Sequence, residues 1–156
     1  MLPSLTFVLG GAASGKSLVA ENIIYNSDLQ LVYVATSRIF DDEMQTKINT
    51  HIARRDARWT TISVEKDIPE VLVKLTNNQA VLIDCVTMWL TNISLDGDDV
   101  DLAQSNFLRA LTASSAPLVV VSNEVGQGIV PDNALSRQFR EAQGRLNIAL
   151  AARADC

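Results

Sequence analysis

Short runs of apolar residues alternate along this chain with longer segments in which apolar residues recur every three or four positions. The runs are rich in aliphatic and β-branched residues, as buried strands are, and they comprise Leu5–Leu9, Leu31–Ala35, Val81–Asp84 and Leu118–Ser122. Trp59–Ser63 is a possible further strand. Strands that are apolar throughout and alternate with helices predict an α/β fold, in which helices cover both faces of a mostly parallel sheet.

Helical periodicity is clearest in the segments that follow the first and the last of these runs. In the first segment, one helical face can carry Leu18, Ala20, Ile23 and Ile24. In the last, Pro131 suits a first helical turn, and the apolar positions that follow at helical spacing are Leu135, Phe139, Ala142, Leu146 and Leu150. A sheet of this class is expected to close with another strand, and no apolar run follows this helix before Cys156.

A glycine-rich segment lies between the first predicted strand and the first predicted helix. Its sequence GGAASGKS has the spacing G-x-x-x-x-G-K-S of a phosphate-binding loop, and its residues are Gly10, Gly11, Ala12, Ala13, Ser14, Gly15, Lys16 and Ser17. Backbone N–H groups of such a loop surround an anion at the N-terminus of the following helix. Lys16 is expected to reach the β- and γ-phosphates, and the Ser17 hydroxyl to bind Mg²⁺. Together with the strand–helix alternation, the loop predicts a P-loop NTPase with a RecA-like sheet.

A carboxylate ends the third apolar run, in the sequence VLIDC. Such a strand in a nucleotide-binding protein delivers its carboxylate to Mg²⁺, directly or through water, so Asp84 is a candidate metal residue together with Ser17. Many buried strands also end in Asp for structural reasons, and only the upstream loop makes the metal interpretation specific.

Polar residues follow two of the other predicted strands. Thr36, Ser37 and Arg38 leave the second strand at the edge where parallel strands present side chains to a ligand. They are candidates for hydrogen bonds to a nucleotide, although helix capping would also explain them. After the fourth strand, Asn123 and Glu124 reach the same edge, and Gly126 and Gly128 predict a mobile or tightly turned loop. This is a possible substrate loop, and a plain connecting loop is the alternative.

The single histidine, His51, lies in the segment DDEMQTKINTHIARRDARW, which predicts a helix with an apolar seam. Helical spacing places several cations on the face of His51, namely Lys47, Arg54, Arg55 and, if the helix continues, Arg58. Neighbouring cations disfavour the imidazolium ion, so this face could hold a neutral, nucleophilic imidazole and bind a polyphosphate. From spacing alone, a surface histidine on a charged helix is the other interpretation.

Length, net charge and cysteine content limit the classes of protein to which this chain can belong. The chain has 156 residues and a net charge of -5, which suits one globular domain spanning residues 1–156 and argues against bulk binding to nucleic acid or to an anionic membrane. No apolar run is long enough to cross a membrane. Cys85 and Cys156 form no disulfide framework, which predicts a reduced, cytoplasmic protein. The acidic segment SLDGDDVDLAQSN does not have EF-hand spacing and predicts a solvated connector.

Five motifs occur along the chain in this order: GGAASGKS, YVATSRIFDDEM, INTHIARRDARW, DCVTMWLTN and SNEVGQGIVPDNALSRQFREAQGRLN. Over nearly the whole chain they resemble the bifunctional adenosylcobinamide kinase/adenosylcobinamide-phosphate guanylyltransferase family of cobalamin biosynthesis. The resemblance implies phosphorylation of adenosylcobinamide, then transfer of GMP from GTP to adenosylcobinamide phosphate through a guanylylated histidine. It implies Mg²⁺, GTP and ATP as ligands and a homotrimer.

Residue roles carried over from the resemblance follow the matching positions. His51 corresponds to the guanylylated histidine, and with Lys16 it is the expected catalytic pair. The implied nucleotide contacts, besides the phosphate loop, Thr36–Arg38 and Asp84, are Arg55, Asp56, Ala57 and Arg58. The chain departs from the family at Ser63, where some members are acidic, and in having no apolar strand after the last helix. A P-loop kinase for another small molecule and a nucleotide-dependent regulatory module are the alternative functions.

Overall fold

The elements of the fold alternate between strands and helices from the first residues onward. The computed structural model describes residues 2–11, 15–37, 58–123 and 134–156. In chain order its elements are β1 (Leu5–Gly10), α1 (Lys16–Tyr25), β2 (Gln30–Ala35), β3 (Trp59–Ser63), α3 (Ile68–Leu72), β4 (Gln79–Asp84), α4 (Val86–Leu95), α5 (Val100–Ala113), β5 (Leu118–Asn123) and α6 (Ala134–Arg153). Every predicted strand is confirmed, including the possible one at Trp59–Ser63.

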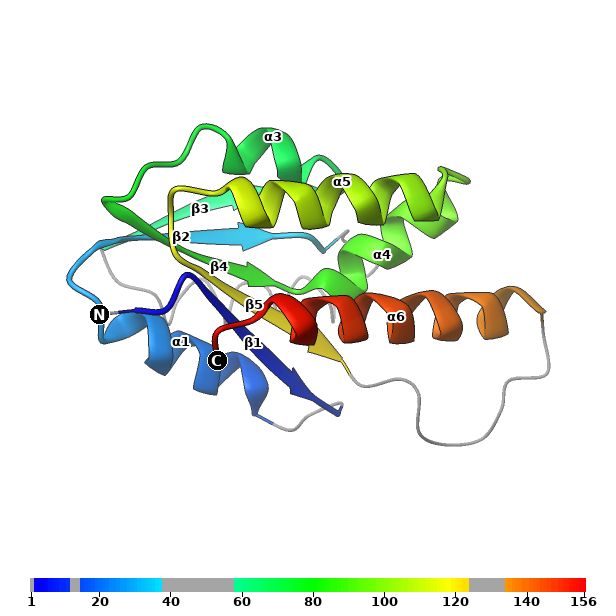
Figure 1. The fold of residues 1–156 in the computed structure, drawn as a ribbon, viewed down its shortest axis with the longest axis horizontal. Coiled ribbons are helices and arrows are strands. Elements are labelled where there is room, and N and C mark those ends of the chain that lie inside the picture. The colour runs from blue at the N-terminus through cyan, green and yellow to red at the C-terminus, as the bar shows by residue number, and fades with distance from the viewer. Residues whose placement is uncertain (1, 12–14, 38–57, 124–133) are drawn as a thin grey trace, which may run out of the picture.

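The strands of the described residues form one five-stranded sheet, in the order β1-β5-β4-β2-β3, and all neighbouring pairs are parallel (Figure 1). The carboxyl ends of the strands therefore meet at one edge of the sheet. Strand β5 separates β1, which leads into the glycine-rich loop, from β4, which ends in Asp84. The register places Gly10 beside Asn123 and Asp84 beside Val121, so β1 and β5 end level with each other and β4 ends two residues short of them.

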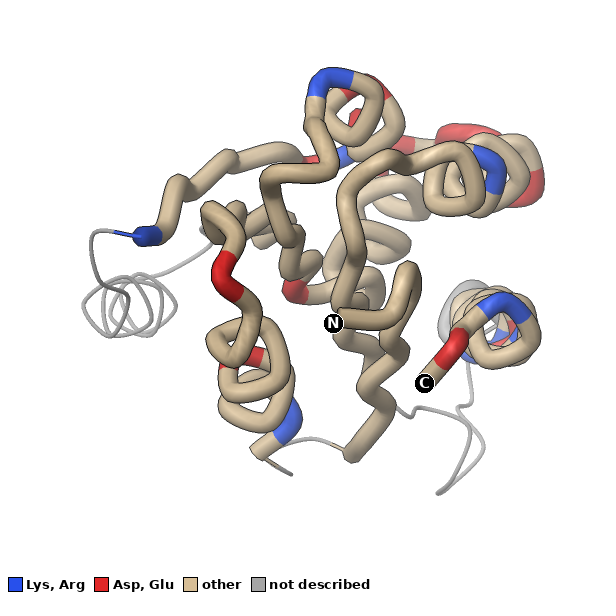
Figure 2. Tube along the Cα trace, turned by 60° about the vertical axis from the view of Figure 1, so that its left-hand side comes forward, with Lys and Arg blue, Asp and Glu red and all other residues tan. Residues whose placement is uncertain are grey.

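Helices cover both faces of the sheet, as predicted. On one face, α1 buries Ala20 and Ile24 against alternate residues of the strands, among them Leu31 and Leu82. The other face is covered by α3, α4, α5 and α6, whose larger buried side chains include Trp89, Phe107 and Leu146. Viewed nearly along the helices, α1 and α6 lie on opposite sides of the strands, and residues of both charge signs are spread along the described trace (Figure 2).

The residues after α6 run along the outer edge of β1. The Asp155 amide donates to the Leu5 carbonyl (2.8 Å), and the Phe7 amide donates to the Cys156 carbonyl (2.9 Å). The Asp155 carboxylate also accepts from the Leu5 amide (3.1 Å). The apolar pattern predicts no strand here, and the contact needs none, because it consists of main-chain bonds and one side-chain bond rather than of apolar burial.

Asp96 and Asp98, in the acidic segment between α4 and α5, pair with Lys66 (2.8 and 2.9 Å), and these bonds raise the lysine pKa. Asp99 accepts from the Leu102 amide (3.0 Å) and caps α5, so the predicted connector is shorter than its polar sequence suggests. Among the described residues, no three His, Cys, Asp or Glu side chains cluster as metal ligands. No described helix is long and apolar enough to cross a membrane.

Candidate active site

The glycine-rich loop occupies the turn between β1 and α1, at the carboxyl edge of the sheet. Gly15 directly precedes α1 with φ 79° and ψ 13°, a left-handed conformation that favours glycine. A Cβ atom there would meet nothing within 4 Å, so the backbone angle and not crowding calls for glycine. The first turn of α1 has no acidic side chain, which leaves its positive end open to an anion. Ala12, Ala13 and Ser14 lie outside the described residues.

Lys16 is the first residue of α1, and its half-buried side chain bends back over the loop. Its Nζ donates to the Gly11 carbonyl (3.1 Å), and this bond is exposed to solvent. An exposed bond to a neutral carbonyl is weak enough to be exchanged for a phosphate oxygen, which accepts a charge-assisted hydrogen bond. The position therefore suits the phosphate-binding role that the motif predicts.

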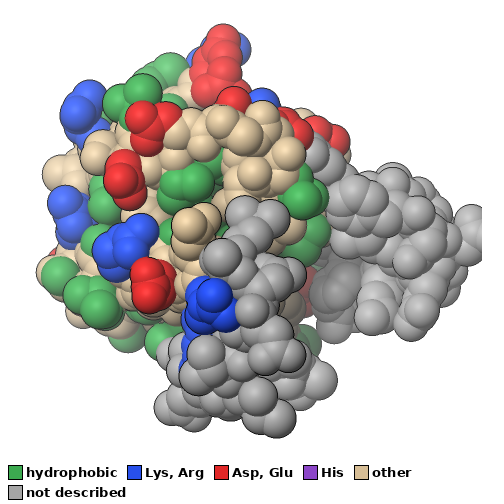
Figure 3. All heavy atoms as spheres, turned by 90° about the vertical axis from the view of Figure 1, so that its right-hand side faces the viewer, with side chains coloured by type: hydrophobic (Ala, Val, Ile, Leu, Met, Phe, Trp, Pro, Cys, Tyr) green, Lys and Arg blue, Asp and Glu red, His purple; other side chains and the backbone are tan. Residues whose placement is uncertain are grey.

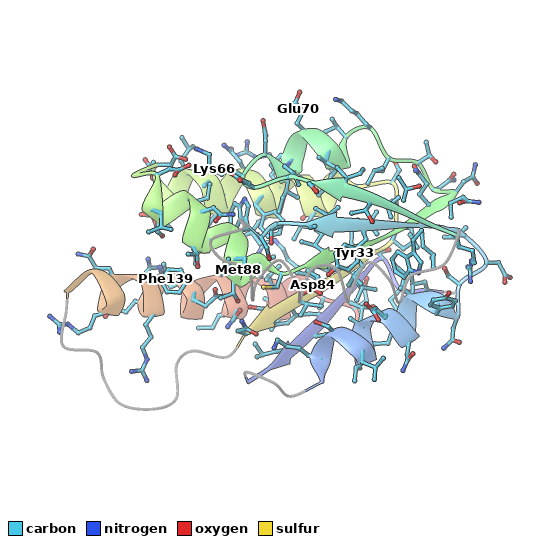
Figure 4. The ribbon with its side chains drawn as sticks, turned by 180° about the vertical axis from the view of Figure 1, so that it is seen from behind. Tyr33, Lys66, Glu70, Asp84, Met88 and Phe139 are labelled. Atoms are coloured by element: carbon cyan, nitrogen blue, oxygen red, sulfur yellow. The ribbon has the colours of Figure 1, made fainter. Side chains whose placement is uncertain are left out.

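Asp84 at the end of β4 joins the loop to the centre of the sheet. The Ser17 hydroxyl donates to Asp84 Oδ2 (3.1 Å), and the Tyr33 hydroxyl donates to the same oxygen (2.7 Å). Figure 4 shows Asp84 and Tyr33 close together on the side of the sheet that faces α1. A hydroxyl and a carboxylate are oxygen donors of the kind that Mg²⁺ prefers, so Ser17 and Asp84 fit the predicted metal site.

Thr36 follows β2 and is fully buried. Its hydroxyl donates to the Cys85 carbonyl (2.8 Å) and accepts from the Cys85 amide (3.2 Å). Thr36 thus fixes the backbone directly after Asp84, and the structure does not turn its hydroxyl toward the loop. Burial raises the pKa of the Cys85 thiol, which keeps it protonated at neutral pH. Ser37 is half-buried after β2, and Arg38 lies outside the described residues.

Asn123 at the end of β5 lies beside Gly10, where the loop begins. Its backbone N–H donates to the Thr87 hydroxyl (2.9 Å), while its side-chain Oδ1 is buried and accepts no hydrogen bond from the part of the chain that the structure describes. Beneath it, Ser122 donates to Asn147 Oδ1 (2.6 Å), and Gln143 donates to the Ser122 hydroxyl (3.0 Å). This buried network anchors the end of β5. Glu124, Gly126 and Gly128 of the possible substrate loop lie outside the described residues.

Arg58 lies at the opposite edge of the sheet, in the turn before β3. Its guanidinium donates to the carbonyls of Tyr25 (3.3 Å) and Leu29 (3.1 Å) and to that of Ser27, and it stacks over the Tyr25 ring at 5.3 Å. A cation at these carbonyls stabilises the C-terminus of α1. The structure therefore does not bring Arg58 to Lys16 and Asp84 within this chain. His51, Arg55, Asp56 and Ala57 lie outside the described residues.

The comparison with protein families decides the identity. Residues 6–156 match the family model described as cobinamide kinase / cobinamide phosphate guanyltransferase. The chain belongs to this family. It is accordingly a bifunctional enzyme of cobalamin biosynthesis, as the motifs indicate, with kinase and guanylyltransferase activities.

Curated relatives are similar over almost their whole length. The bifunctional adenosylcobalamin biosynthesis protein CobU of Escherichia coli (strain K12) is 38% identical over 97% of this chain and 92% of its own. Its counterpart in Salmonella typhimurium has the same identity and coverage. The bifunctional adenosylcobalamin biosynthesis protein CobP of Pseudomonas aeruginosa is 37% identical over 95% of this chain and 87% of its own.

Solved structures that resemble this fold share little sequence with it. The RadB recombinase has a TM-score of 0.53 at 18% identity, covering 90% of this chain and 72% of that chain. A type III secretion system ATPase of pathogenic bacteria has a TM-score of 0.59 at 11% identity, covering 99% of this chain and 50% of that chain. These likenesses confirm the RecA-like fold.

The five motifs also contain residues around the loop to which the sequence alone assigns no role. They are Tyr33, Thr87, Asn92, Gln143 and Asn147. Asn92, which is fully buried, donates to the carbonyls of Thr36 (2.7 Å) and Glu65 (3.0 Å), and so ties α4 to the ends of two strands. Of these residues, only Tyr33 could be placed near Asp84 from the sequence pattern. Side chains alternate along β2, so Tyr33 lies on the same face as Ala35, which lies beside Asp84.

Proposed function

We propose that the carboxyl edge of the sheet binds the nucleotide of the kinase reaction, with the γ-phosphate at the loop Gly10–Ser17. The observation that carries the proposal is the meeting of Lys16, Ser17 and Asp84 where the helix α1 begins. Figure 3 faces this edge and shows acidic, basic and apolar side chains interspersed on its described surface. The described features of this edge that suit a phosphate are the loop and the N-terminus of α1.

The residues at this edge have separate tasks in the proposed kinase step. Backbone N–H groups at the start of α1 bind phosphate oxygens, and Lys16 exchanges its bond to Gly11 for one to the transferred phosphoryl group. Mg²⁺ held by Ser17 and Asp84 would supply electrostatic stabilisation of that group. Asn123 lies beside Gly10, where the loop begins, and is a candidate contact for the aminopropanol group of adenosylcobinamide.

For the second reaction we propose a guanylyl-histidine intermediate on His51. The imidazole nitrogen attacks the α-phosphorus of GTP, an N–P bond forms, and pyrophosphate leaves with the electrons of the broken P–O bond. A phosphate oxygen of adenosylcobinamide phosphate then attacks the same phosphorus, and the N–P bond breaks to give adenosylcobinamide-GDP. The proposal is supported by the family resemblance around His51 and by the absence of any other histidine in the sequence.

A homotrimer in the cytoplasm, with ATP or GTP as kinase donor, completes the proposal. The trimer is supported by the family resemblance alone. Two free cysteines agree with a reducing compartment. The contacts that the resemblance implies for Arg55, Asp56, Ala57, Ser37 and Arg38 stay predictions.

The test is to incubate the protein with Mg²⁺ and α-labelled GTP and to map the adduct. We expect an acid-labile, base-stable phosphoramidate on His51, released pyrophosphate in equal amount, and no adduct in His51→Asn. An adduct on another residue, or normal GMP transfer by His51→Asn, would contradict the intermediate. A kinase for another small molecule, or a regulatory module, would form no histidine adduct and would not turn over faster with cobinamide.

A further inference from the structure

One oxygen of Asp84 receives two hydrogen bonds, and only one of the donors belongs to the phosphate loop. Ser17 is the last residue of the phosphate loop, and its hydroxyl lies 3.1 Å from Asp84 Oδ2. Tyr33 comes from the middle of β2, and its hydroxyl lies 2.7 Å from the same oxygen. The tyrosine bond is the shorter of the two, and the tyrosine is buried, with 6% of its surface exposed.

Strand geometry explains why a tyrosine makes this bond. Tyr33 lies beside Leu82 in the parallel register, and Asp84 follows two residues later on the same face of β4. Two residues of a strand span about 6.6 Å, so only a long side chain that leans along the strand can reach the carboxylate. Phenylalanine would fill the same space but would donate nothing.

The ring of Tyr33 is held in place by its neighbours. It packs edge-on against Trp59 of β3, with ring centroids 6.1 Å apart, and Trp59 packs in the same way against Tyr25. On the same face it belongs to the apolar cluster that α1 covers, with Leu31 and Leu82. A side chain fixed in this way presents its hydroxyl at one position, which is what a supporting contact to a functional group requires.

We propose that Tyr33 is a positioning residue that orients the Asp84 carboxylate for Mg²⁺ at the phosphate loop. The inference rests on the proposed function, in which Ser17 and Asp84 hold the metal. A hydrogen bond to one carboxylate oxygen sets which way the other faces, and such outer contacts tune metal affinity. When the Ser17 hydroxyl turns to the metal, the bond from Tyr33 is the one that keeps Asp84 in place.

The test compares Tyr33→Phe with Tyr25→Phe, which removes a hydroxyl from the same aromatic cluster but not from Asp84. Binding of a non-hydrolysable GTP analogue is measured by calorimetry, first with EDTA and then over a Mg²⁺ titration. Mg²⁺ should increase the affinity for the analogue. We expect Tyr33→Phe to raise by about tenfold the Mg²⁺ concentration at which half of this increase is reached, and to leave the affinity in EDTA unchanged. Tyr25→Phe should match the wild type in both measurements.

A merely structural hydroxyl gives a different result, because its loss would change the affinity equally with and without Mg²⁺, or change neither. Either outcome would overturn the inference and leave the proposed nucleotide site intact. In an Asp84→Asn background, Tyr33→Phe should add no further change to the Mg²⁺ dependence, and an additive effect would also overturn it. If the wild type itself showed no tightening by Mg²⁺, both the inference and the proposed metal site would fail.

Discussion

Two cations of this chain donate to main-chain carbonyls at opposite edges of the sheet. Lys16 makes one solvent-exposed bond at the carboxyl edge, to the Gly11 carbonyl of its own loop. Arg58 makes three bonds at the amino edge and stacks on Tyr25, which ties the C-terminus of α1 to the start of β3. The first arrangement is easily exchanged for a ligand and the second is not, because exchanging it would leave several carbonyls without their donor.

The difference shows that the position of a residue relative to its strand outweighs its charge. Lys16 follows β1, whereas Arg58 precedes β3, and a parallel sheet sends these two positions to opposite edges. The same reasoning separates Asp84, at the carboxyl end of β4, from Asp155, whose carboxylate bonds to Leu5 at the amino end of β1. We expect residues at the carboxyl edge of the sheet to serve nucleotide binding, and residues at the amino edge to stabilise the fold.

The largest expected effect is that of Lys16→Ala on the nucleotide. Loss of a charge-assisted phosphate contact costs about 1.5–3 kcal/mol of binding free energy, so affinity should fall by about tenfold or more, and the kinase rate should fall further. The unfolding free energy should change by less than about 0.5 kcal/mol, because the lost bond is exposed. Calorimetry and denaturant titration measure the two quantities, with exposed Lys74→Ala as the matched control. Unchanged kinase rates in Lys16→Ala would refute the role of the loop.

Arg58→Ala should show the opposite pattern. Its guanidinium bonds and its stacking on Tyr25 are expected to contribute about 1–3 kcal/mol to the unfolding free energy, while nucleotide affinity stays at the wild-type level. Arg58→Lys keeps the charge but loses the planar guanidinium, so its unfolding free energy should lie between those of the wild type and Arg58→Ala. A selective loss of nucleotide affinity in a stably folded Arg58→Ala protein would instead support the family-implied contact.

The strands and most helices could be predicted because long apolar runs and helical periodicity leave a clear pattern. The site could be predicted only where a motif encodes it, as at Gly15, Lys16 and Ser17. The resemblance implies a nucleotide contact for Arg58, and this stays a prediction. Arg58 would share the face of His51 only if that helix continued, whereas the possible strand at Trp59 predicts that Arg58 directly precedes a strand, as the structure has it. The bond from Thr36 to Cys85 pairs residues 49 positions apart, and no local pattern encodes such a contact.

Asp155→Ala should have a smaller effect, confined to stability. The variant removes the side-chain bond to the Leu5 amide at the outer edge of β1 but keeps the two main-chain bonds of Asp155 and Cys156. A single bond of this kind contributes about 0.5–1.5 kcal/mol, so thermal denaturation should detect it. Asp155→Asn, which keeps one acceptor oxygen, should recover most of the loss. A change in nucleotide affinity in either variant would weaken the division between the two edges.

The smallest effect is expected at Lys66, a cation that lies beyond the carboxyl end of β3 and is engaged by Asp96 and Asp98. These hydrogen bonds raise its pKa above the ordinary value of 10.5, so its contribution to stability is complete below that pH and is lost as the pH rises through the raised value. Lys66→Met should remove this alkaline dependence, seen in denaturant titrations at several pH values, without changing nucleotide affinity. If affinity fell, position at the carboxyl edge alone would suffice for a role in binding.

The most direct measurement is a crystal structure with Mg²⁺ and a non-hydrolysable GTP analogue, because it locates the phosphates and the metal in one experiment. The account predicts phosphates against the N-terminus of α1, with Lys16 turned from Gly11 to a phosphate oxygen and the metal at Ser17 and Asp84. Arg58 should still contact the carbonyls of Tyr25, Ser27 and Leu29. Phosphates bound at the amino edge beside Arg58, with Lys16 and Asp84 free of nucleotide and metal, would contradict it.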